Sequence, residues 1–324
     1  AVLWCAPAVA VDLTTPAPAH PRLFFDAAGV DSIRARCAVA GSTHARLLAG
    51  LRTWVQGSIY PDAIGTADKT NANLESIAAL WVAEADSAAA DTAVKVAMWT
   101  ARNAKELDST NNGHTGLSTL ALAYDWCYDR FTEAQRDTVA GALARAATLS
   151  TSQPSGPWYG FYGNYRFEFA WSVYGDAETY TYYPTSTVYT DSTVVYNGEK
   201  WLDALHDHFL PCLNQVHPNG YRESYPGRRQ MPLVFAAMAT SHVSSWDAMT
   251  EPYFLGIPAH YRARYRPDRE MMRGTSKYNT AQTQWLFRQP MWSDSLSTAM
   301  SALTLAAYAP SGWDTRDDWI YLFT

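Results

Sequence analysis

Residues 117–128 read Leu-Ser-Thr-Leu-Ala-Leu-Ala-Tyr-Asp-Trp-Cys-Tyr, and the apolar side chains of this stretch recur at the spacing of an α-helix. One face of the predicted helix carries Leu117, Leu120, Ala121, Tyr124 and Tyr128. Asn111-Asn112-Gly113-His114 comes just before it, a composition typical of a loop that caps a helix. The stretch therefore predicts an amphipathic helix that begins after a polar loop.

The same periodicity recurs on both sides of this stretch. Three earlier apolar faces consist of Leu47, Leu48, Leu51 and Trp54, then Leu74, Ile77, Ala78 and Trp81, then Val94, Ala97, Met98 and Ala101. Downstream, Thr132 and Gln135 have the spacing of a capping box, which predicts that another helix begins there. Further helices are expected within 202–213, 233–238 and 296–307, and one short strand within 187–196.

Roughly ten helices in succession are too many for a four-helix bundle, so they have to form layers. No fixed sequence period marks a regular repeat array. We therefore expect an all-α fold, an incomplete (α/α) toroid built from helical hairpins.

Composition narrows the classes of protein further. The 324 residues are 48% hydrophobic and 17% charged, which is typical of a globular protein with a large core. The net charge of −6 argues against a nucleic-acid partner, and no apolar run reaches the ~18 residues of a membrane span. Ala8-Val9-Ala10 resembles the end of a secretory signal. We expect a signal remnant and linker over 1–19, one domain over 20–324, and a secreted or periplasmic protein; the oligomeric state stays open.

Two short stretches carry the groups best suited to chemistry, 163–168 (Gly-Asn-Tyr-Arg-Phe-Glu) and 220–229 (Gly-Tyr-Arg-Glu-Ser-Tyr-Pro-Gly-Arg-Arg). A tyrosine with an arginine four residues later can have its phenol pKa lowered, because a nearby cation favours the phenolate. An amide can hold the carboxylate of an acidic substrate. Cleavage of a uronic acid chain by β-elimination needs charge stabilisation at that carboxylate and an acid and a base beside it. These stretches therefore favour a polysaccharide lyase acting on an acidic polysaccharide.

Aromatic residues are concentrated between 158 and 183, mixed with glycines and a proline. Part of this set suits a core, and the rest suits a loop platform on which sugar rings stack. Trp158 and Tyr162 are the candidate stacking residues, and Arg166 and Arg228 are candidate contacts for substrate acids. Local positive charge comes from a wider set: Arg222, Arg228, Arg229, Arg262, Arg264, Arg266, Arg269 and Arg273.

Three stretches together resemble the heparinase II/III-like polysaccharide lyases and alginate lyases of similar build: His20-Pro21-Arg22-Leu23, the helix over 120–129, and residues 219–225. The resemblance is scattered over nearly the whole chain and is strongest in the last stretch. It implies an (α/α) toroid that a β-sandwich domain normally follows. Because the chain ends at Thr324, we expect the toroid domain alone.

The resemblance also implies roles for individual residues. Tyr225 matches the tyrosine that acts as general acid, and in some members also as base, and Arg229 matches an arginine four positions beyond it. Asn164 matches the asparagine that neutralises the substrate carboxylate. Where the family usually has a histidine after that asparagine and a glutamate three positions on, this chain has Tyr165 and Glu168. A histidine-base mechanism is therefore in doubt.

The base stays open between Tyr165, Tyr225 and a group from elsewhere, with His114 and His217 as candidate substrate contacts. Glu168 and Glu223 each lie near arginines and are interpreted as ion-pair partners that orient the site. The sequence predicts no metal site and no cofactor; a metal in a second domain stays open. One alternative is a toroidal glycoside hydrolase in which two of Glu168, Asp207 and Glu223 act as acid and base. Another is a glycan-binding domain without catalysis.

Overall fold

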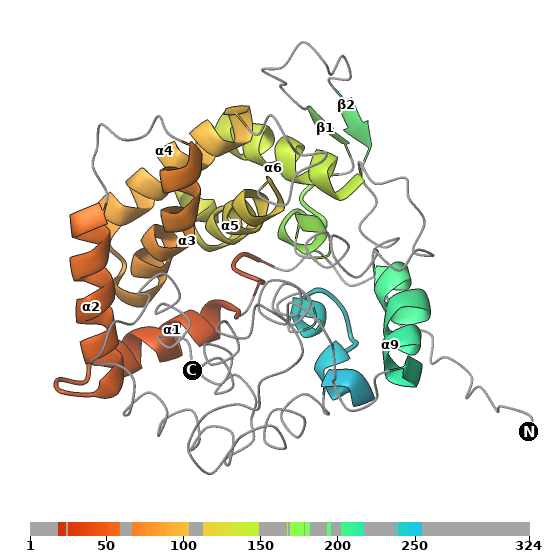
Figure 1. Ribbon diagram of the computed structural model, residues 1–324, viewed down its shortest axis with the longest axis horizontal. Helices are drawn as coiled ribbons and strands as arrows, with labels where there is room; N and C mark the ends of the chain where they lie inside the picture. The colour runs from red at the N-terminus through yellow and green to blue at the C-terminus, as the bar shows by residue number, and fades with distance from the viewer. Residues whose placement is uncertain are drawn as a thin grey trace, which may run out of the picture.

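The computed structural model describes residues 19–23, 25–58, 67–103, 113–148, 167, 169–177, 179–181, 193–195, 202–216, 237 and 239–254. The larger helices within these ranges are α1 (Ala27–Cys37), α2 (Thr43–Ser58), α3 (Ala67–Glu84), α4 (Ser87–Asn103), α5 (Gly113–Trp126), α6 (Glu133–Thr148) and α9 (Leu210–Val216). Shorter turns of helix occupy Tyr128–Arg130, Ala204–Phe209 and Ala248–Thr250. Helices thus dominate the described residues, which confirms the helical fold class (Figure 1).

Helix α3 lies at the centre of the N-terminal half and packs against α1, α2, α4 and α5 (Figure 1). Helix α4 also contacts α5 and α6, and α5 contacts α6. The helices pack closely because many buried positions hold alanine, whose small side chain lets neighbouring backbones approach. In α3 and α5 these positions include Ala78, Ala79, Ala83, Ala121 and Ala123, each at most 2% exposed.

The helix boundaries follow local sequence signals. The side chain of Asp26 accepts a hydrogen bond from the backbone amide of Gly29 and so caps α1. At the start of α6, the Thr132 amide donates to Gln135 Oε1 at 2.9 Å, and the Gln135 amide donates to Thr132 Oγ1 at 3.4 Å. The predicted capping box is therefore confirmed.

The predicted apolar faces are buried. Leu48 and Leu51 of α2, Leu74, Ile77 and Ala78 of α3, Val94, Ala97 and Ala101 of α4, and Leu117, Leu120, Ala121 and Tyr124 of α5 all belong to the core. Two details of the prediction are wrong. Gly113 and His114 belong to α5 itself, and Tyr128 lies in the short helical turn after it, because α5 ends at Trp126.

A small antiparallel ribbon adjoins α6. β1 (Thr179–Thr181) pairs with β2 (Thr193–Val195), with Tyr180 opposite Val194. β2 lies inside the predicted strand region, whereas β1 lies at the end of the segment interpreted as an aromatic platform. Helix is found over most of the predicted range 202–213, with a π-helical turn at Ala204–Phe209. Among the described helices, none is long and apolar enough to cross a membrane.

Candidate functional site

The residues predicted to perform chemistry fall almost entirely outside the described ranges. These are Asn164, Tyr165, Glu168, Glu223, Tyr225 and Arg229, together with the proposed substrate contacts Trp158, Tyr162, Arg166, Arg228 and His217. His114 has its backbone in the first turn of α5, and its side chain is outside the described part. The structure does describe a buried polar network. This network contacts residues 173–176, which follow the first predicted catalytic stretch, and His242, which follows the second.

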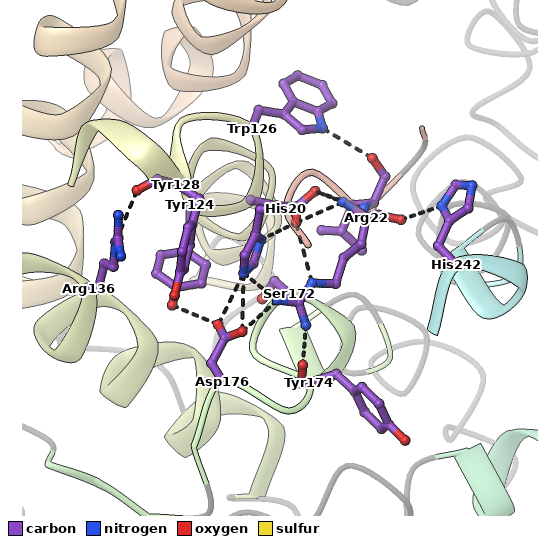
Figure 2. A network of polar contacts seen from close by, with 12 residues as sticks. His20, Arg22, Tyr124, Trp126, Tyr128, Arg136, Ser172, Tyr174, Asp176 and His242 are labelled. Carbon is purple, nitrogen blue, oxygen red and sulfur yellow. Dashed lines mark hydrogen bonds and ion pairs between the residues drawn. The ribbon is translucent and has the colours of Figure 1, made fainter. Parts of the chain in front are cut away.

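This network lies around Arg22 and is here called the Arg22 junction: His20, Arg22, Tyr124, Asp125, Asp176 and His242. Figure 2 shows His20, Arg22, Tyr124, Asp176 and His242 of this network. Arg22 is 1% exposed and Asp125 is fully buried. A charge in such a place is stable only when it is paired and hydrogen-bonded, so each contact of the junction matters.

Asp125, near the end of α5, holds the N-terminal segment. Its carboxylate accepts hydrogen bonds from the backbone amide of Arg22, at 3.1 and 2.9 Å, and from that of Leu23, at 2.7 Å. It also accepts from His20 Nδ1 at 2.6 Å. The neighbouring Trp126 adds a hydrogen bond from its indole nitrogen to the Leu23 carbonyl at 3.2 Å. The end of α5 thus fixes residues 20–23 through both backbone and side chain.

Asp176 is the second carboxylate of the junction. It accepts from Arg22 Nη2 at 2.5 Å and from the Tyr124 hydroxyl at 2.9 Å, and both of its oxygens lie 3.2 Å from His20 Nε2. Gly175 before it has a φ of +74°, a conformation that favours glycine, so the turn can present Asp176 to Arg22. Burial raises the pKa of Asp176, but the hydrogen bond from His20 and the charge of Arg22 outweigh it and leave that pKa lowered.

Aromatic rings cover the histidine side of the junction. The His20 ring stacks on Tyr128 with 3.7 Å between centroids, and the Arg136 guanidinium lies 4.0 Å from the centroid of the same tyrosine ring. Burial and the Asp176 charge raise the pKa of Tyr128, against the opposing effect of Arg136 and Arg22. Tyr128 is therefore a neutral phenol at neutral pH and is unsuited to act as a phenolate base.

Two of the three stretches that carry the family resemblance meet in this junction. His20 and Arg22 come from the first, and Tyr124 and Asp125 come from the second (Figure 2). Their roles were not predicted from the sequence, and Asp176 was not singled out at all. The available signals were weak: a charged Asp125 in an otherwise apolar helix, and the Gly175-Asp176 pair typical of a turn.

Asp207, one candidate carboxylate of the hydrolase alternative, lies on the π-helical turn and is exposed. It accepts from His206 Nδ1 at 2.6 Å, and the His206 ring packs edge-on against Trp246. Within the described residues, no group of three or more His, Cys, Asp or Glu side chains is arranged to hold a metal ion. In the junction, the guanidinium of Arg22 lies between the carboxylates of Asp125 and Asp176.

No protein-family model matches the chain, and no curated protein matches it significantly.

Proposed function

We propose that this protein is an exported lyase that cleaves an acidic, uronate-containing polysaccharide by β-elimination within an (α/α) toroid. The observation that carries the proposal is the junction. It joins residues 20–23 to the helix over 120–129, two stretches that resemble the lyase family. It also binds Asp176 and His242, which follow the predicted catalytic stretches 163–168 and 220–229.

The packing of the helices supports the toroid. Helices α3 and α5 contact one another, as do α4 and α6, while α3 and α4 pair as neighbours in sequence. Alternate helices thus pair with each other in two layers, which is the arrangement expected of successive hairpins that curve around a common centre. In Figure 1, α2, α4 and α6 follow an outer arc, and α3 and α5 lie on its inner side.

In the proposed reaction, Asn164 and Arg229 bind the uronate carboxylate and stabilise the negative charge that develops there. A base, for which we propose Tyr165, removes the proton from the carbon next to the carboxylate. The electron pair of that bond forms a carbon–carbon double bond, and the bond to the glycosidic oxygen breaks. Tyr225 donates its proton to this leaving oxygen. No water is consumed, and the new chain end is unsaturated.

The proposal is tested by incubating the protein with alginate, heparan sulfate, hyaluronan and ulvan and following the absorbance of the new double bond. On the substrate that reacts, Tyr225→Phe is expected to lower kcat about a hundredfold or more, because the proton donor is lost. Tyr221→Phe removes a hydroxyl from the same stretch and serves as the matched control, with activity near wild type. Reducing ends that form without unsaturated product would instead favour hydrolysis, and equal activity of the two variants would exclude Tyr225 as the acid.

A further inference from the structure

Arg22 is bound by three separate parts of the chain at once. Its backbone amide donates to Asp125 of α5, at 2.9 Å to the nearer oxygen. Its two terminal nitrogens donate to the turn over 173–176, Nη1 to the Tyr174 carbonyl and Nη2 to the Asp176 carboxylate. Its backbone carbonyl accepts from His242 Nδ1 at 2.7 Å, and His242 lies on the helical residues 239–243 (Figure 2).

The turn over 173–176 and the helical residues 239–243 each follow one of the two predicted catalytic stretches in the sequence. The turn over 173–176 follows the stretch that holds Asn164 and Tyr165, and residues 239–243 follow the stretch that holds Tyr225 and Arg229. Both predicted catalytic stretches are therefore followed by a flank that binds the same buried arginine.

The first flank is packed into the core just before the turn over 173–176. Phe167 is fully buried against Phe209 and Trp171, with 5.4 and 6.0 Å between ring centroids. The second flank is held in the same way, because Thr240 is buried and its hydroxyl accepts from the Ala248 amide at 2.9 Å. Each flank is thus packed into the core where it meets Arg22.

We infer that the Arg22 junction is a positioning device, which fixes the flank of the Asn164 stretch and the flank of the Tyr225 stretch relative to each other. This inference rests on the proposed function for its role in turnover. Arg22 suits the task because its two terminal nitrogens bind two different residues of the turn, the Tyr174 carbonyl and the Asp176 carboxylate. A buried network of this kind favours one arrangement, because the loss of one partner leaves a buried charged group unpaired.

The coupling of the two flanks is tested by amide hydrogen exchange of the full chain. Asp176→Asn is expected to accelerate exchange in its own flank and also in 237–243, and His242→Ala is expected to accelerate exchange in 167–177 in return. The control Asp91→Asn removes the charge of an exposed pair with Arg130, whose nitrogen–oxygen distance is 2.6 Å, and His44→Ala removes a histidine of α2. Both controls are expected to leave the two flanks unchanged.

Exchange that rises only in the mutated flank, or that rises evenly over all helices, would overturn the inference. This measurement does not depend on turnover, so it decides the coupling even if the protein proves not to be a lyase.

The role in turnover is tested on the reacting substrate. Asp176→Asn is expected to lower kcat about tenfold or more with a smaller change in KM, because displaced catalytic groups lose alignment. In an Asn164→Ala background the same change is expected to cost much less, since the group to be positioned is gone. Leu51→Ala, a core change in α2, controls for stability. An equal kcat loss in Leu51→Ala, or full additivity with Asn164→Ala, would assign the junction a purely structural role.

Discussion

The carboxylate of Asp176 makes the free energy of unfolding depend on pH in the acidic range. Its pKa in the folded protein is lowered from the ordinary 3.8, since the hydrogen bond from His20 and the charge of Arg22 outweigh the effect of burial. A carboxylate whose folded pKa is lowered stabilises the protein above its unfolded pKa, and this stabilisation is lost as the pH falls through the folded value. The other groups that face it are the Tyr124 hydroxyl and the ring of Tyr128.

We therefore expect the free energy of unfolding of the wild type to fall on acidification below about pH 4. Asp176→Asn should be less stable at neutral pH and should lose less stability over the same acid range. Urea unfolding between about pH 6 and about pH 3 measures both. The same acid slope in variant and wild type would show that Asp176 does not contribute in this way.

At the scale of residues, the sequence reveals which side chains are unusual but not which of them meet. Asp125 lies in an apolar helix that the sequence predicts, yet its partner His20 is 105 positions away, and Asp176 is 156 positions from His20. Periodicity reports the environment of one helix face and carries no information on contacts over such separations. The junction could therefore not be predicted, although both quoted stretches that form it could be recognised.

At the scale of elements, the start of α6 is the clearest case of a local signal that decides structure. Thr132→Ala removes the hydroxyl that caps the Gln135 amide and is expected to cost about 1 kcal/mol of unfolding free energy. Thr138→Ala, within the same helix, removes a hydroxyl that only returns a hydrogen bond to the Ala134 carbonyl at 2.9 Å. Thermal unfolding of the two variants makes the comparison, and an equal loss for both would contradict the capping role.

The helices α2 to α6 could be predicted because each has an apolar face, as the burial of Leu48, Leu74, Val94 and Leu120 shows. Helix α1 has no such marked face, with only Ile33 and Cys37 buried, and its signal is the Asp26 cap. Strand β1 was missed because its three residues form a strand by pairing with β2, a partner that the local sequence does not reveal.

At the scale of the whole molecule, a helical scaffold holds the segments that follow the proposed catalytic residues. In the described ranges α3 packs against α1, α2, α4 and α5, and the junction binds the N-terminal segment to the flanks that follow both predicted catalytic stretches. The candidate catalytic residues themselves were predicted from residue chemistry and the family resemblance. Their proximity to one another stays a prediction that is open to direct chemical test.

The most direct test of the central claim is the mass of the reaction products formed in water enriched with heavy oxygen. β-Elimination adds no water, so we predict a new chain end that is lighter than the hydrolysis product by one water molecule and carries no heavy oxygen. A saturated non-reducing end, with products that carry the full mass of one added water for each bond cleaved, would show hydrolysis and contradict the proposed function.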